Sequence, residues 1–258
     1  NVDYRNNVIY NWGSNSTYGG EDGSFNIVNN YYKPGPASKE KKYFVDAYWH
    51  NSDSNVGSAY PRLYMSGNYH AGSYASAINA DNWAGVYFHP QGNDPSTTAG
   101  RLSAPLPIKA GDVTVCYTTT HTAAEAFESV VTYAGASLSR DAVDKRAETD
   151  ARSGKATFPD GGNGSTGGLI DSQSAVGGWP ELKATSDQIA RASVDTDGDG
   201  IPDYYETLLG LDPKDASDAA ATTLDPQKVY SNIEVYFHFL VKEIAASQVK
   251  GGSYTALQ

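Results

Sequence analysis

The fold of this chain is decided by the stretch Val2-Asp3-Tyr4-Arg5-Asn6-Asn7-Val8-Ile9-Tyr10, which returns as Phe25-Asn26-Ile27-Val28-Asn29-Asn30-Tyr31-Tyr32-Lys33. The offset from Asn7 to Asn30 is 23 residues, and a more distant copy is Leu63-Tyr64-Met65-Ser66-Gly67-Asn68-Tyr69. Short β-rich stretches that recur in this way are typical of a parallel β-solenoid, in which each copy is one coil. We predict that Asn7, Asn30 and Asn68 form a ladder of hydrogen-bonded side chains along the solenoid axis, at turns that suit asparagine.

The composition favours the same architecture. Only 39% of the 258 residues are hydrophobic, whereas glycine (26) and tyrosine (19) are abundant. Many turn formers and few long apolar runs favour short strands over a helical bundle. We therefore expect an all-β fold with a small C-terminal helical calcium-binding module. The main part would be a right-handed parallel β-helix, a single-stranded solenoid that is incomplete at its N-terminal end, because the chain begins inside the strand pattern.

The charge of the chain limits its partners. The formal net charge is -11, whereas a protein that binds nucleic acid needs a basic surface for the phosphates. We expect no nucleic acid partner and no membrane span, because no stretch has the length of a membrane-crossing helix. An acidic chain is compatible with calcium, and it binds a polyanion only where cations offset the repulsion.

The sequence divides into two predicted domains. Residues 1–191 are expected to hold the C-terminal coils of the β-helix with helical and loop decoration. Helices are expected over 123–133 and 140–152, and Trp179 is expected to pack back on the solenoid. Residues 192–258 are expected to hold an EF-hand-like calcium loop and a terminal amphipathic helix. Ser231 and Glu234 fit a capping box at the start of that helix.

The sharpest chemical motif begins at Asp195 and ends at Glu206. It matches D-x-D-x-D-G-x5-E at every required position, and Gly200 supplies the sharp turn. Calcium needs several oxygens, which a coiled acidic loop can supply. We expect no helix directly before the loop. The predicted ligands of Ca²⁺ are the side chains or carbonyl of Asp195, Asp197, Asp199, Ile201, Asp203 and Glu206.

A second acidic run follows the loop. Asp212, Asp215 and Asp218 are spaced in a way that fits no calcium template well. Two readings stay open, a second ion or a set of turn and cap residues, and the second reading is favoured.

Several stretches together carry a resemblance to a known family. They are Arg5-Asn6-Asn7-Val8-Ile9-Tyr10-Asn11-Trp12-Gly13, Tyr18-Gly19-Gly20-Glu21, Asn26 through Pro36, Gly135 through Asp141 with Val143-Asp144-Lys145-Arg146, and Ile170-Asp171-Ser172-Gln173 through Trp179-Pro180. Residues 1 to about 182 resemble the C-terminal half of a polysaccharide lyase family 1 pectate lyase of the kind found in gut Bacteroidetes. The acidic module resembles the calcium repeats of the dockerin and thrombospondin type 3 families.

The resemblance implies cleavage of polygalacturonate by β-elimination. In that family an arginine removes the proton at C5 of the uronate, and calcium bridges the enzyme and the substrate carboxylate. The arginine lies in an R-x-P-x-x-R motif, which does not occur in residues 1–258, so no catalytic residue is assigned. The resemblance implies an upstream half of the same protein as a partner. Tyr18, Glu21 and Lys33 are the candidates to border the substrate groove, with turn formation as the alternative role.

Two other functions remain open. The chain could be a non-catalytic carbohydrate-binding or adhesion β-solenoid that calcium stabilises. It could also be a polygalacturonase-type β-helix hydrolase, although that chemistry uses paired carboxylates and no tight pair stands in a coil. The resemblance to pectin-degrading enzymes of Bacteroidetes implies a secreted, periplasmic or cell-surface location in a bacterium.

Overall fold

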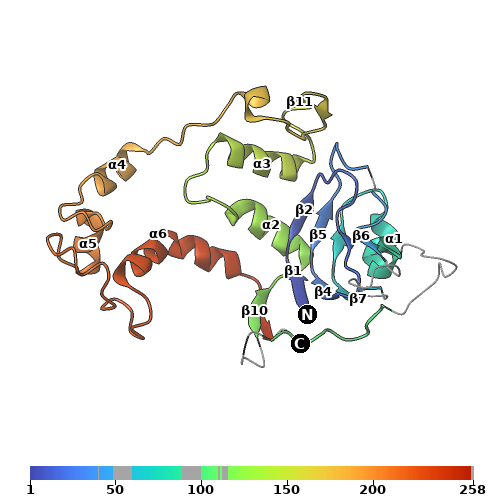
Figure 1. The fold of residues 1–258 in the computed structure, drawn as a ribbon, viewed down its shortest axis with the longest axis horizontal. Coiled ribbons are helices and arrows are strands. Elements are labelled where there is room, and N and C mark those ends of the chain that lie inside the picture. Colours follow the sequence, from blue (N-terminus) through green and yellow to red (C-terminus); the bar gives the residue numbers. More distant parts are fainter. Residues whose placement is uncertain (40, 49–59, 89–99, 110, 112–115, 257–258) are drawn as a thin grey trace. The chain divides into compact units, whose positions relative to one another are not determined.

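The computed structural model describes residues 1–39, 41–48, 60–88, 100–109, 111 and 116–256 (Figure 1). The chain divides into two compact units. The first comprises Asn1–Gly135, Ala142–Trp179 and Val249–Gln258, and the second comprises Ala136–Asp141 and Pro180–Gln248. The predicted domain boundary between residues 191 and 192 stays a prediction.

The first unit is built on stacked parallel sheets. Each sheet takes one strand from each of three successive coils, in the orders β1-β4-β7, β2-β5-β8 and β3-β6-β9. All the pairings within them are parallel, and Val2 pairs with Phe25 at the offset that the repeat predicts. The strands are β1 (Val2–Arg5), β2 (Val8–Tyr10), β3 (Tyr18–Gly19), β4 (Ser24–Val28), β5 (Tyr31–Lys33), β6 (Val45–Ala47), β7 (Arg62–Ser66), β8 (Tyr69–His70) and β9 (Val86–Phe88). Parallel sheets stacked in sets fit a β-helix.

The core of the coils is apolar and aromatic. Ile27 pairs with Met65 in register, and both side chains are buried. The rings of Tyr32 and Phe44 stack with centroids 4.8 Å apart, and both are fully buried. Burying a side chain of this size contributes about 2 kcal/mol, so the alternation of apolar positions along the strands fixes which face points inward.

The predicted asparagine ladder is confirmed. The side chain of Asn30 accepts hydrogen bonds at Oδ1 from Asn7 N and Asn7 Nδ2, at 3.0 and 2.9 Å. Its Nδ2 donates to Asn68 Oδ1 and to Tyr4 O, both at 2.9 Å. Every hydrogen-bonding position of this buried amide is therefore used, which is the condition for burying a polar side chain at low cost.

The ladder has a further rung that the sequence repeat does not show. Asn82 Oδ1 accepts from Asn68 N and Asn68 Nδ2, at 2.8 and 3.1 Å, and Asn82 Nδ2 donates to Asn68 O at 2.8 Å. Asn82 does not belong to a coil strand. It begins the 3-10 helix η1 (Asn82–Gly85), which follows helix α1 (Ala75–Ala80). These short helices close the described end of the ladder.

The residue before each ladder asparagine turns the chain. Asn6, Asn29 and Gly67 have φ angles of 55°, 52° and 65°, in the left-handed region. The prediction that these turns suit asparagine is correct at Asn6 and Asn29. The residue with left-handed backbone angles, however, comes one position before each ladder asparagine. A Cβ on Gly67 would lie 1.8 Å from Asn29 Oδ1, so only glycine fits at that copy of the turn.

Helices cover one of the sheets in the first unit, so the expected all-β class is only partly right. Helices α2 (Ala123–Tyr133) and α3 (Ala142–Ser153) form where two helices are predicted. Phe127, Val131 and Ala151 form a buried cluster that packs on side chains of β2 and β5. His121 O, just before α2, accepts from Asn6 Nδ2 at 2.9 Å and from Asn29 Nδ2 at 2.7 Å. The left-handed turns thus also hold the first helix.

The first unit ends in irregular segments. Antiparallel strands β10 (Tyr117–Thr120) and β13 (Ser253–Ala256) bring the end of the chain back to it. Strands β11 (Asp160–Gly162) and β12 (Ser165–Thr166) form a hairpin, and a 3-10 helix, η2 (Gln173–Val176), follows. The prediction that Trp179 packs back on the solenoid is wrong, because its side chain is 81% exposed. The glycine pair Gly177 and Gly178 has φ angles of 97° and 84° and turns the chain at that point.

The second unit is small and helical. It holds α4 (Ser186–Ala192), α5 (Asp203–Leu209) and most of α6 (Asn232–Val249). Its core contains Ile201, Ala219 and Tyr236. The expectation that no helix precedes the acidic loop is wrong. Helix α4 ends three residues before Asp195, and it has a capping box between Thr185 and Gln188 that sequence inspection missed.

Candidate functional site

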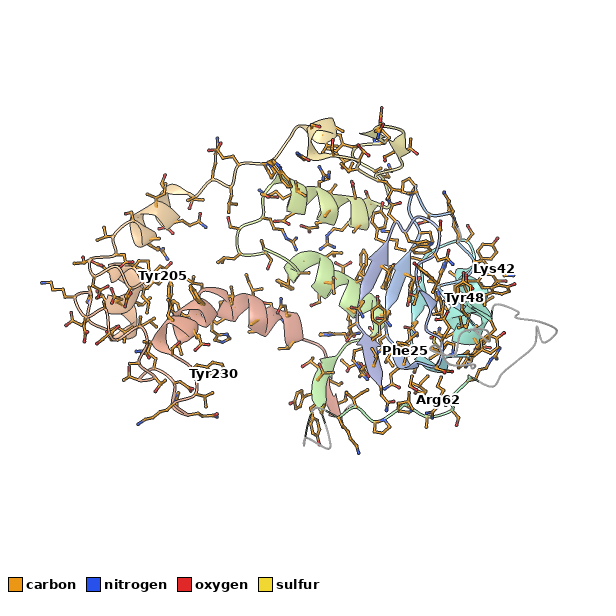
Figure 2. The ribbon with its side chains drawn as sticks, viewed as in Figure 1. Phe25, Lys42, Tyr48, Arg62, Tyr205 and Tyr230 are labelled. Atoms are coloured by element: carbon orange, nitrogen blue, oxygen red, sulfur yellow. The ribbon has the colours of Figure 1, made fainter. Side chains whose placement is uncertain are left out.

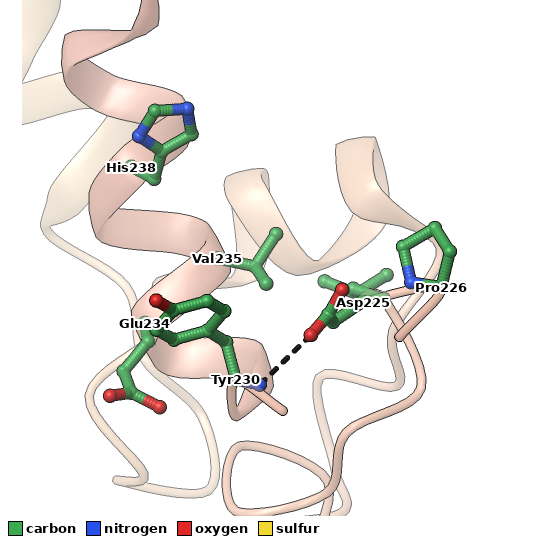
Figure 3. A pocket seen from close by; sticks show the side chains of 7 residues that line it. Asp225, Pro226, Tyr230, Glu234, Val235 and His238 are labelled. Atoms are coloured by element: carbon green, nitrogen blue, oxygen red, sulfur yellow. Dashed lines mark hydrogen bonds between the residues drawn. The ribbon is translucent and has the colours of Figure 1, made fainter. Parts of the chain in front are cut away.

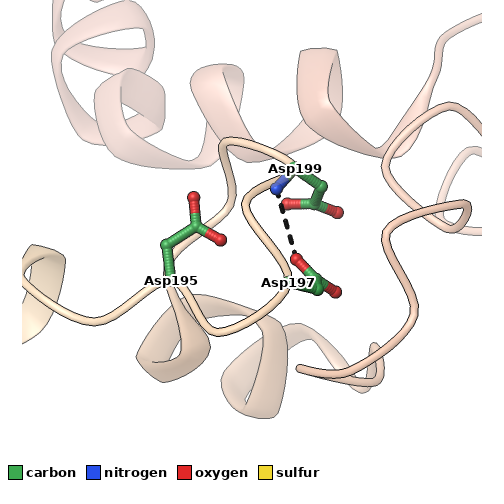
Figure 4. A group of neighbouring side chains, drawn as sticks. All are labelled: Asp195, Asp197 and Asp199. Carbon is green, nitrogen blue, oxygen red and sulfur yellow. Dashed lines mark hydrogen bonds between the residues drawn. The ribbon is translucent and has the colours of Figure 1, made fainter.

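The acidic loop between α4 and α5 is folded by its own carboxylates (Figure 4). Asp195 accepts hydrogen bonds from Gly198 N at 2.8 Å and from Gly200 N at 3.1 Å. Asp197 Oδ1 accepts from Asp199 N at 3.2 Å. Gly198 and Gly200 have φ angles of 77° and 99°, which let the loop coil tightly. The carboxylates at alternate positions are thereby held on the inside of one turn.

Glu206 is the most buried carboxylate of the loop. Its side chain is 0% exposed, and neither Oε1 nor Oε2 has a hydrogen-bond partner. Asp197 Oδ2 and Asp199 Oδ2 are also buried without a partner. Buried unpaired carboxylates are costly, because neither water nor a donor compensates their charge. The arrangement therefore fits a bound cation.

The raised pKa values of two loop carboxylates reflect the same unfavourable burial of negative charge. Burial raises the pKa of Glu206 to about 7, and the negative charges of Asp197, Asp199 and Asp218 add to the effect. Burial also raises the pKa of Asp197. Like charges in a shared desolvated site favour the protonated form until a cation binds.

Two of the predicted ligands, Asp203 and Ile201, also make hydrogen bonds within the loop. Asp203 begins α5, and its carboxylate accepts from Thr196 N at 2.7 Å and Thr196 Oγ1 at 2.6 Å. Each oxygen thus accepts one hydrogen bond, and these bonds lower the pKa of Asp203. Ile201 buries its side chain in the core of the second unit and donates its N–H to Asp199 Oδ1 at 2.8 Å.

Asp218 joins the cluster from outside the loop. Asp199, Glu206 and Asp218 each bring a carboxylate oxygen within 4.8 Å of the other two. Asp195, Asp197 and Asp199 form an overlapping group of the same kind. Sequence inspection favoured Asp218 as a turn or cap residue. Two of its neighbours fit that reading, because Asp212 and Asp215 accept backbone N–H groups of their own turns.

A group of tyrosines stands on the outward face of the sheet β3-β6-β9. Tyr18 pairs with Asp46 in register, and Asp46 pairs with Tyr87. Tyr18 is 70% exposed and meets the ring of Tyr48 edge to face, with centroids 6.4 Å apart. Tyr87 stacks on Tyr43 at 5.0 Å. We call these four rings the tyrosine face; Figure 2 labels Tyr48.

Charged groups lie beside the tyrosine face. Lys42 Nζ is 5.0 Å from the centroid of the Tyr43 ring. The pKa of Tyr48 is raised by burial and then by the charge of Asp46, with smaller effects from Tyr18 and Glu21. Tyr18 and Glu21 were predicted to border a substrate groove, and the structure brings them together here. Tyr18 lies in strand β3, which fixes the direction of its side chain.

Lys33, the other predicted substrate residue, has a different setting. Its Nζ donates to Ala151 O and Arg152 O, both at 2.7 Å, at the end of α3. It also lies 5.1 Å from the centre of the Phe127 ring. A cation that binds the last carbonyls of a helix stabilises its C-terminus. The structure thus gives Lys33 a helix-capping role.

The second unit also has a cavity of about 570 Å³ (Figure 3). Its two carboxylates serve local structure. Asp225 accepts from Gln227 N, Val229 N and Tyr230 N, and Glu234 accepts from Ser231 N and Ser231 Oγ. The contact predicted between Ser231 and Glu234 is therefore present. The cavity is lined by Leu224, Asp225, Pro226, Tyr230, Glu234, Val235 and His238.

Among the described residues, no helix is both long and apolar enough to cross a membrane. No protein-family model matches the chain. Curated proteins do match it. The chain is 31% identical over 248 residues to "Probable pectate lyase C" of Emericella nidulans, an alignment that covers 96% of this chain and 49% of the relative.

The chain is similar to fungal pectate lyases. The proteins of the same name from Aspergillus flavus and Aspergillus fumigatus are each 29% identical to it, over 93% of this chain and 48% of the relative. The similarity extends over nearly the whole of this chain. The chain spans about half the length of the curated relatives it matches.

The expected bacterial location is wrong, because these relatives come from fungi. The stretches that carried the resemblance, such as Asn6-Asn7 and Asn29-Asn30, are ladder and turn residues. They therefore indicate an architecture and carry no information on the kind of organism.

Proposed function

We propose that this chain forms the C-terminal coils of a family 1 pectate lyase that cleaves polygalacturonate by calcium-assisted β-elimination. The observation that carries the proposal is the asparagine ladder through stacked parallel sheets, in a chain that aligns over 96% of its length with a pectate lyase C. The coils are right-handed in this proposal, in line with the general preference of parallel crossovers.

The reaction removes the C5 proton of a uronate, breaks the bond from C4 to the bridging oxygen and leaves an unsaturated sugar end. Calcium on the uronate carboxylate would make that proton more acidic. The R-x-P-x-x-R motif implied by the resemblance is absent from residues 1–258. The proposal therefore assigns the base to a region that the longer relatives have in addition to the aligned half.

The tyrosine face is the proposed sugar-binding surface of this chain. Exposed aromatic rings offer flat apolar area at low entropic cost, which suits the apolar faces of sugar rings. Asp46 and Glu21 would repel the uronate carboxylates, whereas Lys42 would attract them. Binding should therefore strengthen with calcium, which screens and bridges carboxylates.

Calcium has a second, structural role in this proposal. Asp195, Asp197, Asp199, the carbonyl of Ile201 and Glu206 would hold Ca²⁺ in the loop, with Asp203 supporting the loop through Thr196. Such a module resembles the structural calcium repeats of dockerin and thrombospondin type 3 proteins. Chelation with EDTA should lower the melting temperature of the chain, and an unchanged melt would remove the claim.

A binding measurement tests the sugar-binding surface. We expect the chain to bind oligogalacturonate in calorimetry with calcium, more weakly in EDTA, and not to bind neutral galactan. Tyr18→Ala should weaken binding about tenfold. Tyr254→Ala is the matched control, because Tyr254 is 73% exposed on strand β13 and is stacked on Tyr117. Equal losses of affinity in the two variants would contradict the assignment of the tyrosine face as the sugar-binding surface.

The activity is tested with polygalacturonate and calcium. The whole protein should produce the ultraviolet absorbance of the unsaturated uronate product, and the 258-residue chain alone should not. Binding without product by the whole protein would favour a carbohydrate-binding solenoid. New reducing ends without that absorbance would favour a hydrolase.

A further inference from the structure

We infer that Asp218 is a ligand of the calcium centre, so that the ion fastens the acidic loop to the segment that leads into α6. This inference rests on the proposed calcium site and extends it beyond the twelve residues of the loop motif. It concerns only the second unit, which contains all the groups involved.

The unpartnered oxygens define the site. Five buried carboxylate oxygens of the described loop and its surroundings have no hydrogen-bond partner: Asp197 Oδ2, Asp199 Oδ2, Glu206 Oε1, Glu206 Oε2 and Asp218 Oδ1. Calcium takes about six to eight oxygens at about 2.4 Å, so oxygens on opposite sides of one ion are about 4.8 Å apart. The oxygens of Asp199, Glu206 and Asp218 lie within 4.8 Å of one another. One ion can therefore contact all three residues.

The two carboxylate oxygens of Asp218 have different environments. Its Oδ2 accepts the N–H of Asp212 at 2.9 Å, which fixes the direction of the side chain. Its Oδ1 is buried and has no hydrogen-bond partner, and one oxygen of this carboxylate lies within 4.8 Å of carboxylate oxygens of Asp199 and Glu206. A residue needed only for the turn would use one oxygen and leave the other in water. The burial of Oδ1 without a hydrogen-bond partner, beside two other carboxylates, is the feature that indicates a ligand.

Asp218 adds a carboxylate to those of the loop motif. The Asp203 carboxylate, at the ninth loop position, accepts hydrogen bonds from Thr196 at both oxygens and so supports the fold of the loop. Asp218 supplies a further carboxylate from the following segment. The site keeps a high negative charge, which favours a hard divalent cation.

The main chain around Asp218 connects the site to α6. Asp218 O accepts from Asn232 Nδ2 at 2.8 Å, and Asn232 is fully buried at the start of the helix. Asn232 Oδ1 accepts from Leu224 N at 2.9 Å. Ile233 N donates to Ala219 O at 3.1 Å. An ion that holds Asp218 therefore also orders the segment that wraps the first turn of α6.

The test is a calcium titration of the metal-stripped 258-residue chain by calorimetry. Asp218→Asn can keep the bond to the Asp212 N–H with its remaining carbonyl oxygen, while it removes the charge. We expect the calcium affinity to fall at least about tenfold. Asp215→Asn is the matched control in the same acidic run, because the Asp215 carboxylate serves Ser217. Its affinity should equal that of the wild type.

A second measurement uses the wild type and does not depend on how the variants fold. Hydrogen exchange with and without calcium should show added protection over residues 212–224 as well as 195–206. Protection limited to 195–206, or an Asp218→Asn variant that binds calcium as the wild type does, would overturn the inference and leave the loop site standing. A wild type that binds no calcium would instead remove the proposed calcium centre itself.

Discussion

Asn30 Nδ2 donates to Asn68 Oδ1 at 2.9 Å, while Asn30 Oδ1 accepts both N–H groups that Asn7 presents. The amide of Asn30 lies between the rungs of Asn7 and Asn68, and it is fully buried. Its replacement would leave groups of both neighbouring coils unpaired at once. The ladder is therefore a cooperative feature, in which each rung satisfies the one before it.

Asn30→Ala should lower the free energy of unfolding of the first unit by about 3 kcal/mol or more, because each buried group left unpaired costs about 1–3 kcal/mol. Urea unfolding followed by far-ultraviolet circular dichroism measures the change. Asn1→Ala is the control, since Asn1 is exposed and makes one bond to Pro107 O. A loss for Asn30→Ala no greater than that for the control would show that the ladder does not carry stability.

Gly67→Ala should destabilise the same unit by about 1–3 kcal/mol, because alanine is strained at positive φ. The new Cβ would also displace Asn29, whose Nδ2 donates to His121 O at 2.7 Å. The start of α2 should then lose protection against hydrogen exchange. Gly13→Ala is the control, because no atom lies within 4 Å of a Cβ at that position. Unchanged protection at α2 would show that the turn at Gly67 does not stabilise the start of this helix.

The coil repeat could be predicted from sequence because one local pattern encodes it. Each copy carries the same alternation of apolar residues and the same turn, and Val2 pairs with Phe25 as the repeat requires. The rung at Asn82 could not be predicted, because it comes from a helix outside the repeat. The position of Trp179 was predicted wrongly for a related reason. No local sequence signal says whether an aromatic ring after two glycines is buried.

The acidic loop could be predicted in part. Its carboxylates follow from a local motif, so the proximity of Asp197, Asp199 and Glu206 is encoded in their spacing. The parts played by Asp203 and Asp218 depend on tertiary contacts. Asp203 accepts hydrogen bonds from Thr196, and Asp218 arrives from a segment that folds around Asn232. No spacing rule contains these contacts.

Lys33→Met should reduce stability by about 1–2 kcal/mol and leave oligogalacturonate binding unchanged, because the lost ammonium bonds the last carbonyls of α3. Methionine keeps the apolar stem beside Phe127. Thermal unfolding and the calorimetric binding assay measure the two effects separately. Weaker binding with normal stability would restore Lys33 as a substrate residue.

The last prediction concerns pH and Glu206 in the absence of calcium. Its pKa is about 7 in the folded chain, raised by burial from an ordinary value of 4.5. A raised pKa means that the folded state favours the protonated form. Its contribution to stability is full below pH 4.5 and is lost as the pH rises through 7. In EDTA, the second unit should therefore melt at a lower temperature at about pH 8 than at about pH 5.

Glu206→Gln separates this effect from other titrations. Glutamine carries no charge, so in EDTA the variant should lack the loss and should melt above the wild type at about pH 8. In calcium the order should reverse, because the wild-type carboxylate binds the ion and the amide loses that ligand. Glu243→Gln, at an exposed position of α6, should follow the wild type under both conditions. The same melting order with and without calcium would exclude Glu206 as the group that links metal, proton and fold.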